Sequence, residues 1–299
     1  MGKLAIVFPG QGTQIVGMGR DFYECFDSTK MIFDVIGDSV KNIVLDGTQD
    51  ELNKTVNAQP ALFAAELAIA AGLRENGIEA DGAAGFSLGE ITGLVYCGHF
   101  DFEKGVDFVK FRAKVMQDCA ETNQGGMAAV LGLDTKSVIE LCNGVDGVYP
   151  ANFNLSTQTV VAYKSDAYGE LAQAVSANKG KLVKLAVSGA FHSPLMNSAA
   201  EDVEKYLAEV LVGGGIKPLY SNYTARPYDN PKELIAKQIN NPVRWRQTIE
   251  NMISDGYDAF VEAGPGKVLT GMIKKIDSTV KVYNVFDIAS LNQTINEIR

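Results

Sequence analysis

The sequence is poor in the residues that build metal centres and disulfide frameworks. It has two histidines and four cysteines in 299 residues, and no two cysteines have C-x-x-C spacing. Structural zinc normally takes four Cys or His ligands at short spacings, so no metal site is expected. A chain of this length buries a core that needs no disulfides, and its N-terminus lacks the pattern of a secretory leader. We therefore expect free thiols, a reducing compartment and a cytoplasmic location.

Long apolar runs and excess basic charge are also missing. No segment has the roughly 18 consecutive apolar residues that a membrane span needs, and the formal net charge is −9. That charge disfavours nucleic acids and anionic membranes as partners. No G-x-G-x-x-G follows a predicted strand, and the early glycine loop lacks the G-K-[ST] ending of a P-loop. Flavin, nicotinamide and nucleotide cofactors are therefore not expected.

A serine motif is present instead. Residues 85–90 read Gly-Phe-Ser-Leu-Gly-Glu and match G-x-S-x-G, the pattern of a sharp strand-to-helix turn that presents a nucleophilic serine. Glycine on each side lets the backbone close such a turn without Cβ clashes. A plain glycine-rich turn is the alternative interpretation. Ser87 is a weak nucleophile at neutral pH and needs a base beside it.

Only two histidines are candidates for that base. His192 lies in a loop before a predicted helix, where it can reach into a cleft, and a helix-capping or core role is its alternative. His99 lies at a predicted helix end, where a cationic side chain would complement the helix dipole. We therefore take His192 as the candidate base and His99 as structural.

Acyl transfer also needs N–H donors aimed at the oxyanion. One is normally the backbone N–H of the residue after the nucleophile, which is Leu88 here. The loop at 8–12, directly after the first predicted strand, is suited to supply a second donor.

The pattern of elements changes at Gly125-Gly126 and again near Gly189. Between these points it predicts strands over 127–133, 148–153, 159–163 and 182–187, with helices over 135–141 and 167–177. That order is the split unit of a ferredoxin-like fold. Elsewhere helices alternate with short buried strands, among them a helix over 60–76 and a strand over 217–221. We predict an α/β protein with an α/β-hydrolase-like catalytic body over 1–125 and 191–299 and a ferredoxin-like insert over 126–190.

Seven blocks of sequence stand out along the chain. They are FPGQG (8–12), GFSLGE (85–90), FRAKVMQ (111–117), GMAAV (126–130), AFHS (190–193), NPVRW (241–245) and EAGPGKVL (262–269). In this order and over essentially the whole length, they resemble the malonyl-CoA:acyl carrier protein transacylases, acyltransferases of fatty-acid and polyketide synthesis.

The resemblance implies a role for each matching residue. Ser87 would carry the malonyl ester, and His192 would take the serine proton and later return a proton to the leaving thiolate. The backbone N–H groups of Gln11 and Leu88 would form the oxyanion hole. The main-chain carbonyl of Gln238 would orient the histidine, where other serine enzymes use an Asp.

The same resemblance implies the substrate contacts. Arg112 would hold the malonyl carboxylate, because a planar guanidinium binds a carboxylate with two hydrogen bonds and keeps its charge. Met127, Phe191 and Asn154 would contact the substrate. In related polyketide acyltransferases a Phe before the catalytic His goes with malonyl, so Phe191 predicts malonyl. One methyl is worth only about 1–3 kcal/mol, so we expect preference rather than exclusivity.

Two positions depart from the family pattern. Phe86 stands where the family usually has His, which removes a polar group next to the nucleophile. In 152–158, Asn154 and Gln158 of the usual N-x-N-S-P-G-Q run are kept, but the loop between them differs. Neither departure touches the nucleophile, the base or the arginine.

The resemblance implies malonyl-CoA and holo acyl carrier protein as partners, no further cofactor, and a monomer. Such carrier proteins are strongly acidic. The predicted insert carries five lysines and five acidic residues, so the whole net charge of −9 lies outside it. The insert is therefore the better docking surface. Candidate contacts, whose alternative is a solvated face, are Lys179, Lys181, Lys184, Lys267, Lys274 and Lys275.

Two other classes of function stay open on the sequence. A serine esterase or thioesterase would need an Asp or Glu to orient its histidine and would have no use for Arg112. A non-catalytic carrier-binding scaffold would form no acyl-serine, and the presence of both Ser87 and His192 disfavours it.

Overall fold

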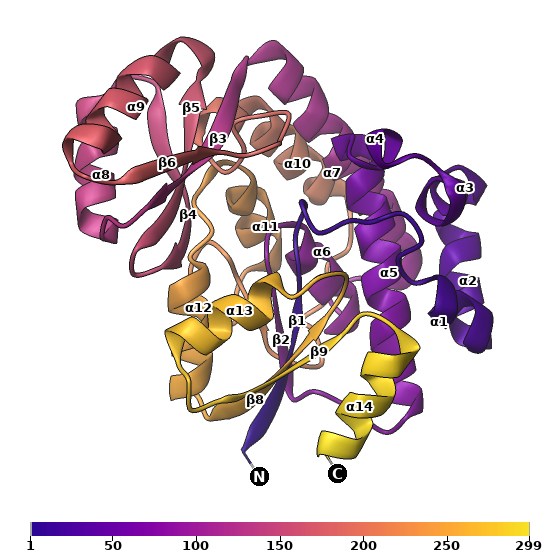
Figure 1. The fold of residues 1–299 in the computed structure, drawn as a ribbon. Coiled ribbons are helices and arrows are strands. Elements are labelled where there is room, and N and C mark those ends of the chain that lie inside the picture. Colours follow the sequence, from indigo (N-terminus) through magenta and orange to yellow (C-terminus); the bar gives the residue numbers. More distant parts are fainter. Residues whose placement is uncertain (1, 299) are drawn as a thin grey trace.

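The centre of the fold is a parallel β-sheet (Figure 1). The computed structural model describes residues 2–298. Within the sheet the strands follow the order β7-β2-β1-β8-β9 and every neighbouring pair is parallel. They are β1 (Lys3–Phe8), β2 (Gly82–Gly85), β7 (Leu219–Tyr220), β8 (Tyr257–Ala263) and β9 (Lys281–Val285). Parallel strands need crossover connections, and helices supply them here.

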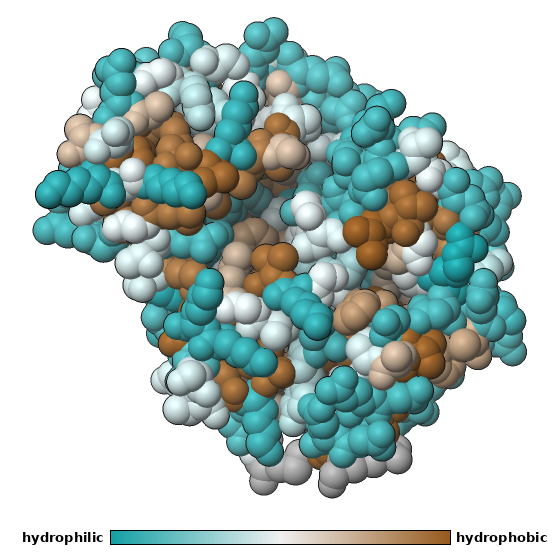
Figure 2. Space-filling model, in the orientation of Figure 1, coloured by the Kyte–Doolittle hydropathy of each residue, from teal (hydrophilic) through white to brown (hydrophobic). Residues whose placement is uncertain are grey.

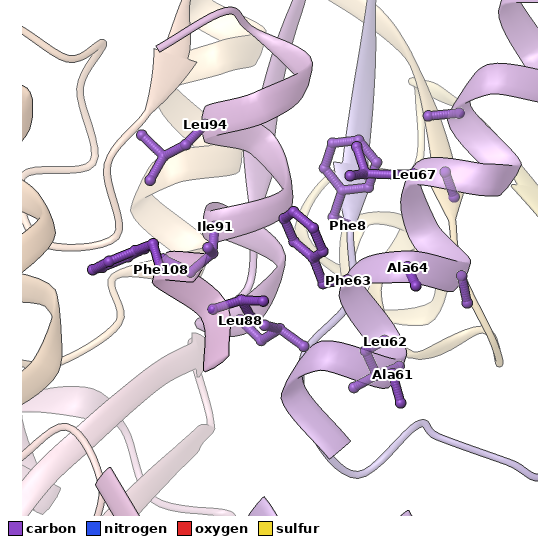
Figure 3. Close-up of a cluster of buried hydrophobic side chains, with 14 of the residues drawn as sticks. Phe8, Ala61, Leu62, Phe63, Ala64, Leu67, Leu88, Ile91, Leu94 and Phe108 are labelled. Carbon is purple, nitrogen blue, oxygen red and sulfur yellow. The ribbon is translucent and has the colours of Figure 1, made fainter. Parts of the chain in front are cut away.

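Strand β1 lies in the middle of this sheet and is buried on both faces. Ile6 and Phe8 belong to one apolar core, and Ala5 and Val7 to another, because alternate residues of a strand point to opposite faces. Figure 3 shows Phe8 against the helices of the first core. These include α5 (Thr55–Glu75), α6 (Leu88–Tyr96) and α7 (Phe102–Thr122), and the second core includes α12 (Trp245–Ser254) and α13 (Val268–Ile276). The turn from β2 into α6 is thus set in a firmly packed layer.

Further helices complete this part of the molecule. Four short ones precede α5 and three others follow residue 196. Their bounds are α1 (Arg20–Cys25), α2 (Asp27–Ile36), α3 (Asp38–Asp46), α4 (Gln49–Leu52), α10 (Asn197–Glu209), α11 (Pro231–Asn240) and α14 (Ile288–Ile298).

A second, antiparallel sheet forms the lobe at the upper left of Figure 1. Its strand order is β4-β5-β3-β6, and a third apolar core lies between it and its two helices. The elements are β3 (Gly125–Leu131), α8 (Thr135–Gly144), β4 (Val148–Leu155), β5 (Gln158–Lys164), α9 (Tyr168–Ala177) and β6 (Lys181–Lys184). The order along the chain is the predicted one: strand, helix, two strands, helix, strand.

Strand β4 is hydrogen-bonded to a segment outside the small sheet. The Phe153 N–H donates to the Val243 carbonyl at 2.8 Å, and the Val243 N–H donates to the Ala151 carbonyl at 2.9 Å. An edge strand of the small sheet is therefore hydrogen-bonded to the segment that leads into α12.

Several predicted bounds were wrong. Helix α5 begins at Thr55, so Pro60 lies inside it rather than in its first turn. Proline there removes one backbone hydrogen bond, but most of this helix is buried, and its contacts outweigh that loss. The predicted strand over 217–221 is reduced to β7, and the last strand of the small sheet ends at Lys184. The helix predicted from Pro194 begins with a 3₁₀ turn, Pro194–Met196, before α10.

Helix α5 is also the one helix among residues 2–298 that is long and apolar enough to cross a membrane, with a mean hydropathy of 1.3 over its most apolar window. Polar residues interrupt its apolar run, so the helix has no unbroken stretch of roughly 18 apolar residues. Of that window, 89% is buried inside the protein, where the helix contacts α2, α6 and α7.

Candidate active site

Ser87 lies at the turn between β2 and α6, in a conformation that few residues adopt. Its φ of 54° and ψ of −99° are strained for a residue with a Cβ. The two glycines of the motif are needed because a side chain at either position would clash with the neighbouring backbone. A Cβ on Gly85 would lie 1.9 Å from the carbonyl carbon of Gly89, and one on Gly89 would lie 2.1 Å from the Phe8 carbonyl oxygen. The sequence therefore forms a tight elbow here, not a plain turn.

His192 meets Ser87 from the segment that returns from the small sheet. Its Nε2 lies 2.6 Å from Ser87 Oγ, and its Nδ1 lies 2.9 Å from the main-chain carbonyl of Gln238. A carbonyl can only accept, so Nδ1 carries the hydrogen and Nε2 is left to accept the serine proton. The group that orients the imidazole is a carbonyl, as the resemblance implied, and not the carboxylate that an esterase reading required.

Arg112 reaches the same serine from α7. Its side chain is fully buried, and Nη2 donates to Ser87 Oγ at 3.3 Å and to the Gln238 side-chain oxygen at 2.8 Å. Nη1 donates to the side-chain oxygen of Gln59. Burial lowers the pKa of Arg112 to about 10, which still leaves it cationic at neutral pH. A cation is thus held within reach of whatever group Ser87 carries.

Two backbone N–H groups beside Ser87 are open. Leu88 is the first residue of α6, where helical N–H groups have no partner within the helix. Gln11 lies in the loop after β1, which the hydrogen bond from the Phe86 N–H to the Phe8 carbonyl holds against the elbow at 2.9 Å. Within residues 2–298, neither the Gln11 N–H nor the Leu88 N–H donates a hydrogen bond to the protein. Both remain available to an incoming acceptor.

A cavity of about 280 Å³ lies between the two sheets, beside Ser87 and His192. Figure 2 shows the surface recessed between the small-sheet lobe and α13. Ser87, His192 and Gln11 line it together with the three predicted substrate contacts Met127, Phe191 and Asn154. Asn154 Oδ1 is buried there without a partner among the described residues. Arg112, Gln238 and Leu88 do not line the cavity. Arg112 donates a hydrogen bond to Ser87 Oγ, and the Gln238 side chain donates one to the Ser87 carbonyl.

Residues 5–294 match the family model described as acyl transferase domain. The chain belongs to the acyl transferase family. The resemblance carried by the seven sequence blocks is therefore confirmed.

The relatives of this acyl transferase are similar over their whole lengths. Malonyl CoA-acyl carrier protein transacylase of Bacillus subtilis is 34% identical over 100% of this chain and 98% of that protein. The enzyme of the same name from Haemophilus influenzae is 35% identical over 98% of each. The structure of the Clostridium perfringens transacylase has a TM-score of 0.95 at 35% identity, covering 99% of this chain and 97% of that one. A malonyl-transacylase in complex with a type II polyketide acyl-carrier protein has a TM-score of 0.94 at 35% identity, covering 99% of each chain.

A polar network beneath the elbow of this acyl transferase was missed in the sequence. Asn222 accepts from the Ser87 N–H at 2.8 Å and donates to the Gly85 carbonyl at 2.6 Å, so it ties both sides of the elbow together. The backbone N–H of Asn222 donates to the Glu90 carboxyl group at 2.8 Å, and Glu90 also accepts from the Tyr228 hydroxyl. The available signal was Glu90 itself, a charged residue within an apolar helix.

Of the other residues singled out in the sequence, Phe86 lines the cavity and His99 does not. His99 is buried and its Nδ1 donates to the Gly213 carbonyl at 2.9 Å, away from the cavity, as a structural role requires. Phe86 packs edge-on against Trp245 with ring centroids 5.6 Å apart.

No cluster of three His, Cys, Asp or Glu suited to a metal occurs in the described part of the chain. A larger hollow of about 410 Å³ beside α5 contains no paired nucleophile and base.

His192 is protonated only at unusually low pH. Burial lowers its pKa from 6.5 to about 4, and the Arg112 cation acts in the same direction. The neutral imidazole, which is the form that accepts a proton, therefore persists well below pH 6.5. We expect a neutral sulfonyl fluoride to modify Ser87 at a nearly constant rate from about pH 7 to about pH 5 and more slowly towards about pH 4.

The reagent carries no titrating group, so the profile reports the enzyme alone. The Ser87→Ala variant measures background labelling, and circular dichroism at each pH confirms the fold. A half-maximal rate near pH 6.5, the ordinary histidine value, would contradict the depressed pKa.

Proposed function

We propose that this acyl transferase moves a malonyl group from coenzyme A to the phosphopantetheine thiol of an acyl carrier protein. The observation that carries the proposal is the contact of Ser87 Oγ with both His192 Nε2, at 2.6 Å, and the buried Arg112, at 3.3 Å. A nucleophile paired with a base and a fixed cation suits an acyl group that bears a carboxylate. Full-length relatives at 34–35% identity are named for this transfer.

The reaction proceeds in two matched halves. Ser87 Oγ attacks the thioester carbon of malonyl-CoA while His192 Nε2 takes the serine proton. The Gln11 and Leu88 N–H groups stabilise the oxyanion. When the carbon–sulfur bond breaks, the imidazolium returns its proton to the leaving thiolate. The carrier thiol then repeats the sequence on malonyl-Ser87, with His192 first as base and then as acid.

The substrate groups take the remaining positions. Arg112 holds the malonyl carboxylate, while Met127, Phe191 and Asn154 border the acyl and thiol path. Water has to be kept from the ester, or hydrolysis would compete with transfer. No cofactor beyond the coenzyme A thioester takes part, and the proposed setting is a cytoplasmic monomer in fatty-acid synthesis.

The proposal extends to the architecture. The βαββαβ order and the 4-1-3-2 arrangement of its strands support a ferredoxin-like insert over 126–190. The serine elbow after a central parallel strand supports an α/β-hydrolase-like body over 1–125 and 191–299.

Intact-protein mass spectrometry tests the proposed function. After brief incubation with malonyl-CoA, the wild-type protein is expected to gain one malonyl increment, and holo carrier protein is expected to discharge it. Steady release of coenzyme A and malonate without transfer would instead identify a hydrolase. A protein that neither gains mass nor turns over would have another donor or a binding role.

Carrier docking gives a further prediction. Lys181 and Lys184 are exposed on β6, an edge strand, and have no ion pair among residues 2–298. The chain continues from β6 directly to Leu185 and Val187, which line the cavity. Reversing both charges, Lys181→Glu with Lys184→Glu, is expected to raise the KM for an acidic carrier protein roughly tenfold at low salt.

If these lysines act on the carrier and not on the coenzyme A phosphates, loading from malonyl-CoA should stay within about twofold of wild type. Lys110→Glu with Lys281→Glu, on α7 and β9, makes the same charge change at two exposed lysines that do not line the cavity and have no ion pair among residues 2–298, and is the matched control. An unchanged carrier KM in the β6 variant, or an equal rise in the control, would remove Lys181 and Lys184 from the docking surface.

A further inference from the structure

Within residues 2–298, the Arg112 guanidinium donates hydrogen bonds only to neutral acceptors. Nη1 donates to Gln59 Oε1, and Nη2 donates to Gln238 Oε1 at 2.8 Å and to Ser87 Oγ at 3.3 Å. No carboxylate forms an ion pair with it within residues 2–298, and its Nε is buried without a partner. A buried cation is usually paired with a buried anion, so this arrangement calls for an explanation.

Gln59 fixes the plane of this guanidinium from α5. Its side chain is fully buried, and its Nε2 faces Met116 Sδ at 3.7 Å, which is a weak acceptor. Since Arg112 has only donors, the amide oxygen of Gln59 must point toward it. The glutamine thus provides one strong acceptor at Nη1 and no charge.

The nearest described acid does not cancel the charge either. Glu90 is fully buried and accepts from the Asn222 N–H at 2.8 Å and from the Tyr228 hydroxyl, but it has no hydrogen bond with Arg112. Burial raises the pKa of Glu90 to about 7, so a large share of it is protonated near neutrality. The positive charge of Arg112 is therefore largely uncompensated and can attract an incoming anion.

We propose that Gln59 is a specificity-determining residue, which orients Arg112 as a neutral acceptor and leaves its charge uncompensated for a substrate carboxylate. This inference rests on the proposed malonyl transfer. A carboxylate at position 59 would form a buried ion pair with Arg112. A malonyl carboxylate would then enter a site with no net positive charge and would be repelled by the new anion. An acetyl group, which has no charge, would not feel this change.

The test compares Gln59→Glu with Gln59→Met, which removes the acceptor and adds no charge. The rates of Ser87 loading from malonyl-CoA and from acetyl-CoA are measured separately, and the readout is the ratio of the two kcat/KM values. We expect Gln59→Glu to lower the malonyl-to-acetyl ratio roughly 100-fold or more. Gln59→Met should lower it less than about tenfold, because Arg112 is less well held but still charged.

Equal ratios in the two variants, or a Gln59→Glu ratio within about threefold of wild type, would overturn the inference. If Gln59→Glu does not fold, Gln238→Glu decides in its place. That substitution puts a carboxylate at the other neutral acceptor, on α11, and leaves the main-chain carbonyl at 238 intact. Its ratio must also fall roughly 100-fold. The wild-type protein separates the two claims, since failure of malonyl loading there would defeat the proposed function itself.

Discussion

Ser87→Ala is expected to accept no acyl group from malonyl-CoA, with a fall in turnover of roughly 10⁶-fold, as in other serine enzymes that lose their nucleophile. Ser87 Oγ is the hydroxyl that His192 Nε2 contacts, at 2.6 Å, and no other group can take over its place on the strained elbow. Mass spectrometry of the protein after incubation with malonyl-CoA measures the effect directly.

Ser156→Ala is the matched control, because Ser156 is an exposed serine in the turn between β4 and β5. It should gain the malonyl increment at the wild-type rate. A malonyl increment on Ser87→Ala that survives removal of free substrate would place the acyl group on a different residue.

The elbow was predictable from the sequence because its demands are local. A side chain at Gly85 would clash with Gly89, and one at Gly89 would clash with the backbone of Phe8 and Pro9. The five-residue pattern therefore shows directly why the turn forms there. His192 was predictable for a different reason, since a chain with two histidines offers few candidates for a base. The order of strands and helices in the small sheet followed from its hydrophobic pattern.

Other parts of the site have no local signature. The acceptor at His192 Nδ1 is the backbone carbonyl of Gln238, which any residue type would offer, so only the family resemblance pointed to that position. Asn222 and Gln59 act across the fold, 135 and 53 residues from their partners Ser87 and Arg112. Helix bounds failed similarly where tertiary burial overrode a local rule, as at Pro60 in α5.

Arg112→Met should separate charged from uncharged substrates. Without the guanidinium, the malonyl carboxylate would be buried with no partner, at a cost of roughly 4 kcal/mol, which corresponds to about a 1,000-fold loss in kcat/KM for malonyl-CoA. Acetyl-CoA loading should fall less than about tenfold, because the nucleophile and the base remain in place. Ser87 loading from each thioester, measured by mass spectrometry, gives the two values.

The same variant carries a second readout that a general loss of structure would not produce. Burial is the main cause of the low pKa of His192, and the Arg112 cation is the next. Removing that cation makes the imidazolium less unfavourable, so the pKa should rise toward 6.5 and the acid limb of Ser87 labelling should move to higher pH. Lys110→Met, an exposed lysine on the same helix, should change neither value. Equal losses with malonyl-CoA and acetyl-CoA would remove Arg112 from carboxylate binding and leave it a role in holding Ser87 and Gln238.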